Sequence, residues 1–188
     1  MTDAASPLTP EQQQELSSAK EGAASFMGAA KVAGFNGWTI GFFAVVSILF
    51  GIFSLSGFVV GVGLAVVTRN EFVGRTRIRG LDLGGLELLW RNQVGFMALI
   101  IGYCFWSMYA TVAFPDAQMT EVMDLLGDGM GEMVQQLTLI VYGAVIVATA
   151  IFQGLNARYY FIRVARMRDY LRDTPKWVID LQRSAAID

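Results

Sequence analysis

Residues 35–68 read FNGWTIGFFAVVSILFGIFSLSGFVVGVGLAVVT, a run of 34 residues without a charged side chain. A single helix of that length would be about 51 Å long at 1.5 Å per residue. Since a hydrocarbon core is about 30 Å thick, one helix would need a tilt above about 50°, outside the usual range. We therefore predict two helices joined near Ser54–Gly57. A tight or re-entrant hairpin that fails to cross the membrane fully is the alternative.

Two more apolar segments follow, at residues 93–114 and 137–157, and Pro115 ends the first of them. The predicted fold is therefore all-α: an integral membrane four-helix bundle built from two helical hairpins. Residues 69–92 form a basic connection that includes a short interfacial helix, and residues 115–136 form an acidic loop. Thr120 is a candidate cap for a short helix in that loop. Residues 158–188 are predicted as a basic helical tail, with a restart at Thr174-Pro175.

Residues 1–34 contain a signal for the start of a helix. Thr9 is suited to the N-cap, Pro10 to the first helical position, and Gln12 can reach back to the cap. The helix is expected to continue to about Ala33 as an amphipathic surface helix. Its apolar positions repeat at spacings of three and four. They form a narrow seam of Leu16, Ala19, Ala23, Phe26, Ala30 and Ala33, which packs on the chain's own bundle or the membrane surface, or joins two copies.

Charge predicts the topology. All fourteen basic residues lie before residue 32, between residues 69 and 91, or after residue 157. Because short loops rich in Lys and Arg stay in the cytoplasm, both termini and the 69–92 connection are expected there. The acidic loop, which has no Lys or Arg, is then extracytoplasmic. Lys20 and Lys31 join the cytoplasmic side only if residues 35–68 double back.

The composition argues against several classes of chemistry. The chain has one cysteine, Cys104, and no histidine, so the usual ligand of haem and zinc and the usual base near neutral pH are missing. Nucleophilic catalysis needs an activating base, which Cys104 lacks. The carboxylates Asp124, Asp128 and Glu132 are better explained as a solvated acidic loop than as a calcium site. We expect no catalytic residue, no cofactor, no metal site and no nucleic-acid partner.

Two sets of residues are candidates for contacts. Arginines on the predicted cytoplasmic face are expected to meet anionic lipid headgroups or a protein partner: Arg75, Arg77, Arg79, Arg163, Arg166 and Arg168. Small residues at four-residue spacing are expected to pack helices within the chain or between subunits: Gly37, Gly41, Gly57, Gly61, Ala65, Ala144 and Ala148.

These observations favour a non-enzymatic function. The leading hypothesis is an oligomerising scaffold or accessory subunit of a larger membrane complex, with the bilayer, other copies or other membrane subunits as partners. A small pore or transport subunit, with Gln153 and Tyr142 among the polar groups at depth, is the first alternative. A membrane-shaping hairpin protein is the second, and it resembles reticulon-type and tetraspan vesicle proteins in layout only.

Overall fold

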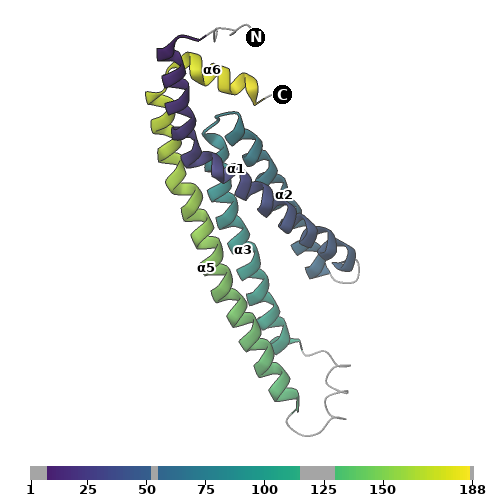
Figure 1. The fold of residues 1–188 in the computed structure, drawn as a ribbon. Coiled ribbons are helices and arrows are strands. Elements are labelled where there is room, and N and C mark those ends of the chain that lie inside the picture. The colour runs from purple at the N-terminus through teal and green to yellow at the C-terminus, as the bar shows by residue number, and fades with distance from the viewer. Residues whose placement is uncertain (1–7, 52–54, 115–129, 187–188) are drawn as a thin grey trace, which may run out of the picture.

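The computed structural model describes residues 8–51, 55–114 and 130–186. Within them the chain forms five helices: α1 (Pro10–Gly51), α2 (Leu55–Arg79), α3 (Gly84–Ala113), α5 (Met130–Asp173) and α6 (Lys176–Ala185) (Figure 1). Helices α1, α2, α3 and α5 are each long and apolar enough to cross a membrane. The predictions of an all-helical fold and of four membrane-spanning segments agree with this. The predicted short helix after Thr120 lies outside the described residues.

Helix α1 begins as the sequence predicts. The Thr9 hydroxyl accepts a hydrogen bond from the Gln12 backbone N–H at 3.3 Å, and the Gln12 side-chain oxygen accepts one from the Thr9 N–H at 3.0 Å. This reciprocal pair satisfies two N–H groups that would otherwise lack partners at a helix start. The capping prediction is confirmed.

Removing this cap is expected to have a small, local effect. Thr9→Ala deletes the side-chain acceptor and should destabilise the first turn by about 1 kcal/mol. Amide hydrogen exchange over residues 10–14 should therefore become faster. Ser17→Ala is the matched control, because its hydroxyl bonds back to the Gln14 carbonyl in the helix interior and caps nothing. Equal acceleration in both variants would contradict the assignment of the cap.

The boundary expected at residue 34 is absent. Helix α1 runs without a break from Pro10 to Gly51, so the predicted surface helix and the first span are one helix of 42 residues. Gly34, Gly37 and Gly41 lie inside this helix. A glycine in a helix interior lowers the stability of the helix by only about 1 kcal/mol relative to alanine. Here they also permit close contact with α2, so they do not end the helix.

Helices α1 and α2 pack antiparallel, so the chain doubles back between them. A Cβ added at Gly37 would lie 3.0 Å from Phe72 Cζ, and one at Gly41 would lie 3.1 Å from Thr68 Cγ2. Near the other end, a Cβ at Gly51 would lie 2.5 Å from the backbone nitrogen of Phe58. Side chains at these glycines would push the two helices apart.

The expected connection at residues 69–92 is largely helical. Helix α2 continues to Arg79 and α3 begins at Gly84, so the turn is short and the separate interfacial helix is a wrong prediction. Leu81 has a φ of 55°, and the Asp82 carboxylate accepts a hydrogen bond from the Gly84 N–H at 2.9 Å. This local bond closes the turn and lets the polar residues on either side remain in regular helices.

Helix α5 likewise combines two predicted segments. It extends for 44 residues, from Met130 to Asp173, through the fourth span and into the basic tail. The restart at Thr174-Pro175 is confirmed, because α6 begins at Lys176 directly after Pro175. The Trp177 indole N–H donates to Glu15 of α1 at 3.0 Å, which ties α6 back to the start of the chain.

The largest buried core lies at one end of the molecule, in a part that we call the head. It comprises residues 16–33 of α1, 78–90 around the α2–α3 turn, 159–171 of α5, and α6. The predicted alanine seam supplies much of this core, and Phe26, fully buried, packs edge-on against Tyr170 with ring centroids 5.2 Å apart. The seam therefore packs within the chain, against α5.

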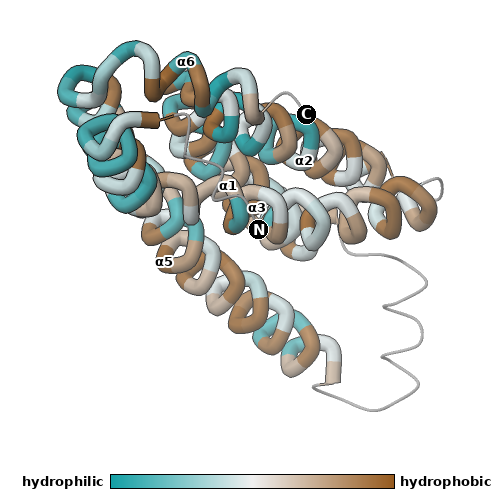
Figure 2. Tube along the Cα trace, turned by 45° about the horizontal axis from the view of Figure 1, so that its top comes forward, coloured by the Kyte–Doolittle hydropathy of each residue, from teal (hydrophilic) through white to brown (hydrophobic). Residues whose placement is uncertain are grey.

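Away from the head, the helices form two hairpins that diverge, α1 with α2 and α3 with α5 (Figure 1). Figure 2 shows that apolar residues are frequent along both hairpins, whereas hydrophilic residues gather at the head. The most apolar stretch of α5 has none of its residues buried within the chain. The apolar parts of these helices are thus largely exposed within the chain.

Candidate functional site

A buried carboxylate lies where the two hairpins meet below the head. Glu71 of α2 is fully buried. Its Oε1 accepts one hydrogen bond from the Asn92 side-chain amide and one from the Gln93 side-chain amide, both at 2.8 Å and both from α3. Glu71 makes no ion pair with any lysine or arginine that the structure describes. The two amides therefore offset part of the cost of burying this carboxyl group.

Asn92 uses the rest of its amide to extend this network along α2. Its nitrogen also donates to the Val67 carbonyl at 3.0 Å, and its oxygen accepts from the Asn70 side-chain nitrogen at 3.0 Å. Asn92 thus saturates both donors of its NH₂ group and one lone pair of its oxygen. Its side chain binds α3 to two successive turns of α2.

Tyr160 brings α5 and α1 into the same junction. This side chain is fully buried, and its hydroxyl lies beside the Glu71 carboxyl. The same hydroxyl accepts a hydrogen bond of 3.4 Å from the Asn36 side chain of α1. Polar groups from all four long helices therefore converge at one level. We call this set of Asn36, Asn70, Glu71, Asn92, Gln93 and Tyr160 the polar junction.

The polar junction is suited to holding helices in register. Within the described residues, no group of three or more Cys, Asp or Glu side chains is placed to hold a metal ion. Glu71 Oε2 and Gln93 Oε1 are buried without a hydrogen-bond partner among those residues. Buried polar groups in lipid need specific partners, and a shifted register would leave more of these groups unsatisfied.

Sequence reasoning did not find the polar junction. Residues 69–92 were predicted as a basic connection with a short interfacial helix, and of the residues in this connection only arginines were candidates for contacts. A signal was nevertheless present: Glu71 is separated from Leu64, Val67, Gly74 and Ile78 by seven, four, three and seven residues, and all five positions are buried. Extending the helical period of the span past Arg69 would have placed Glu71 on the buried face of α2.

The structure does not gather the six candidate arginines on one surface. Arg77 and Arg79 are exposed, and Arg77 lies 3.8 Å from Asp82. Arg166 and Arg168 are exposed on α5, but positions two apart on a helix project about 200° from one another. The charge is therefore spread around the head. The predicted contact with anionic lipid or a partner remains a prediction.

The other two arginines of this set are partly buried and engaged within the chain. The Arg75 guanidinium lies over Gly34, where an added Cβ would be 3.1 Å from Nη1. Arg163 stacks on the Tyr159 ring with Cζ 3.3 Å from the ring centroid, and its Nη1 donates to the Tyr159 carbonyl at 2.9 Å. These two side chains therefore contribute packing as well as charge.

The small-residue candidates divide into two groups. Gly37, Gly41, Gly57, Gly61 and Ala65 lie along the α1–α2 hairpin, and a Cβ at Gly61 would approach the Ile48 backbone nitrogen to 2.9 Å. Ala144 and Ala148 are both exposed on α5. No helix among the described residues covers these two alanines, so they face lipid or another chain.

Comparison with protein-family models, with curated proteins and with solved structures finds no match to this chain.

Proposed function

We propose that this chain is a non-enzymatic scaffold or accessory subunit of a membrane complex. In this proposal the head lies on the cytoplasmic face and the exposed faces of α3 and α5 receive neighbouring membrane subunits. The head supports such a role because it joins both hairpins to one folded core. Its scattered arginines are then available to hold it against anionic headgroups.

The single observation that carries the proposal is the outer face of α5. Ala144 and Ala148 are exposed there, with Ile140 and Ile151 on the same side of the helix. Small residues at this spacing let a second backbone approach closely, which is how helices associate in lipid without a hydrophobic driving force. In the head, by contrast, the comparable alanines of α1 are already covered by α5.

Cross-linking tests whether this face is an interface between copies. Cysteines placed at Ala144 or Ala148, in a Cys104→Ala background, are expected to form disulfide-linked dimers in native membranes. Ala150→Cys is the matched control, because Ala150 is also exposed but projects about 120° or more away from both positions. We expect at least a fivefold higher dimer yield at 144 and 148 than at 150.

Native mass spectrometry of the complex extracted with its lipids is the complementary measurement. The proposal predicts a fixed stoichiometry, either of several copies or of this chain with other membrane subunits. A monomer under every mild extraction, together with equal cross-linking at all three positions, would contradict it.

A membrane-shaping function is a second candidate, and the divergence of the two hairpins favours it. A chain whose helices spread away from the head has a different cross-sectional area at different depths of the membrane. On this alternative, the purified protein alone would deform liposomes into tubules or small vesicles. Liposomes that keep their size and shape at high protein density would count against it.

A further inference from the structure

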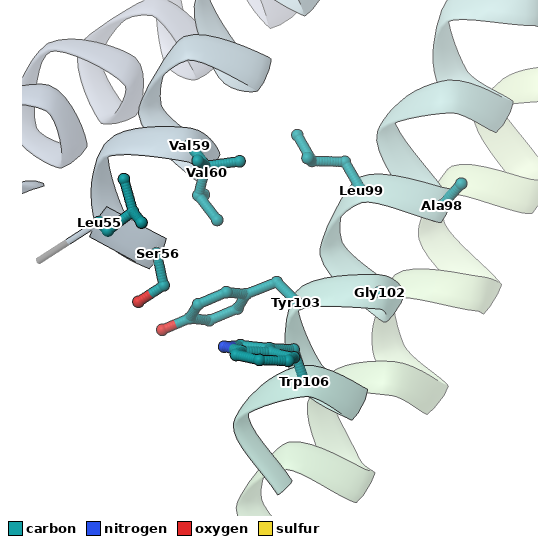
Figure 3. A pocket seen from close by; sticks show the side chains of 9 residues that line it. All are labelled: Leu55, Ser56, Val59, Val60, Ala98, Leu99, Gly102, Tyr103 and Trp106. Atoms are coloured by element: carbon teal, nitrogen blue, oxygen red, sulfur yellow. The ribbon is translucent and has the colours of Figure 1, made fainter. Parts of the chain in front are cut away.

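A cavity of about 750 Å³ opens between α2 and α3 on the side where the hairpins separate. Its walls are mainly aliphatic: Val59 and Val60 of α2, and Ala98, Leu99 and Gly102 of α3 (Figure 3). Toward the head it is closed, because α2 and α3 touch there and a Cβ added at Gly63 would lie 2.6 Å from Leu99. A volume of this size is typical of small-molecule sites.

Polar atoms gather at the other end of the cavity. Ser56 Oγ, Tyr103 Oη and Trp106 Nε1 point toward a common region in Figure 3. Among the described residues, the Trp106 indole N–H has no hydrogen-bond acceptor, although its ring contacts Tyr109. An indole nitrogen can only donate, and a donor surrounded by hydrocarbon is costly to leave unpaired.

The depth of the cavity restricts what can fill it. Leu99 to Trp106 lie in the middle of the uncharged segment 94–114, and seven residues of helix extend over about 10 Å. No Asp, Glu, Lys or Arg lines the cavity, so nothing there compensates a charged or zwitterionic headgroup at that depth. An elongated neutral molecule with one small oxygen-bearing end matches both the walls and the polar end.

We propose that this cavity binds a neutral membrane lipid that has one carbonyl or hydroxyl head, of the quinone or long-chain alcohol type. Its tail would lie along Val60, Leu99 and Gly102, and its oxygen would accept the Trp106 N–H. The aromatic faces of Tyr103 and Trp106 offer apolar surface to a planar head. This proposed lipid site does not depend on the scaffolding role proposed above.

Tryptophan fluorescence of the full-length protein in lipid nanodiscs tests the proposal. The probe is a benzoquinone with a ten-carbon tail, which quenches nearby indoles. Wild type and Trp38→Phe are expected to show a saturable component, and Trp106→Phe is expected to lack it. Trp38 is the matched control, since it is likewise exposed in an apolar segment, at 72% against 56% for Trp106.

A second pair of variants asks whether the cavity itself is occupied. Gly102→Leu should obstruct the cavity and reduce the saturable component at least tenfold, whereas Gly95→Leu should leave it unchanged. Both glycines are on α3, and a Cβ added at either would meet nothing within 4 Å, so neither variant should prevent folding. Circular dichroism of both variants checks this.

Competition identifies the head that is recognised. Decanol is expected to displace the quinone because it supplies an acceptor oxygen, and decane at equal membrane concentration is not. Equal displacement by decane would overturn the role of the polar end. Linear quenching that is identical in wild type and Gly102→Leu would overturn the site. So would a Gly102→Leu variant that keeps the saturable quenching but loses an oligomer, because the cavity would then be an interface between copies.

Discussion

Asn92→Leu is expected to lower the free energy of unfolding by roughly 3 kcal/mol, because each buried polar group left without a partner costs about 1–3 kcal/mol. The leucine keeps much of the volume but leaves Glu71 with Gln93 as its single hydrogen-bond donor and deprives the Val67 carbonyl and Asn70 of a partner. Thermal unfolding in mild detergent, followed by circular dichroism, should show a melting temperature lower by about 10 °C.

The double variant Glu71→Leu/Asn92→Leu makes this prediction specific. Replacing both members of a buried polar pair by apolar residues is often nearly neutral, so the double variant should be more stable than Asn92→Leu alone. Gln136→Leu replaces an exposed amide of α5 and should change the melting temperature little. A double variant that is less stable than either single variant would contradict the account of the polar junction.

Phe26→Ala is expected to destabilise the head by about 3–5 kcal/mol, the usual cost of truncating a buried phenylalanine to alanine. Phe26 is fully buried and packs against Tyr170, and the alanines around it cannot fill the space that its ring leaves. Since α1 contacts α5 through this core, its loss should separate the two helices. Disulfide or chemical cross-links between residues 22 and 170 would report that separation.

Phe35→Ala is the matched control on the same helix. Phe35 is 72% exposed within the chain, so its truncation removes a lipid contact and leaves the core intact. We expect unchanged cross-linking between α1 and α5 and a melting temperature within about 2 °C of wild type, since exposed substitutions usually change stability by less than 0.5 kcal/mol. Equal losses in the two variants would mean that the head is not the main stabilising unit.

The four apolar helices were predictable because the thickness of the hydrocarbon core and the positions of the charged residues allow few ways to divide the sequence into membrane-spanning segments. The start of α1 at Pro10 and the restart at α6 followed from local chemistry at Thr9 and Pro175, which depends on few neighbours. Features of this kind are encoded within a few residues. They are therefore readable without the fold.

Helix ends inside polar segments were not predictable in the same way. Residues 69–79 were predicted to belong to a basic connection because of their charges. In the structure they continue α2, with Glu71, Gly74 and Ile78 on its buried face. Likewise, the N-terminal helix was expected to end near residue 34, whereas in the structure Gly34 lies inside α1 and accommodates the Arg75 side chain. Tertiary contacts decide such positions, and those contacts join residues more than 20 positions apart.

The two hairpins were predicted, but their divergence from a packed head was not. Hydropathy identifies segments that prefer lipid but does not tell how tightly they pack together. The cavity beside Gly102 is a consequence of that divergence. Its polar end comes from Ser56 on α2 and from Tyr103 and Trp106 on α3. The spacing of these residues in the sequence does not indicate that the two helices bring them together.

The central claim is that the chain doubles back after α1, so that the N-terminal lysines and the C-terminal arginines share one side of the membrane. Cysteine accessibility in sealed vesicles of known orientation tests it most directly, with Lys20→Cys, Glu132→Cys and Arg166→Cys placed singly in a Cys104→Ala background. All three positions are exposed on helices. A membrane-impermeant maleimide is predicted to label residues 20 and 166 from the cytoplasmic side and residue 132 from the opposite side. Labelling of residues 20 and 166 from opposite sides would contradict the account.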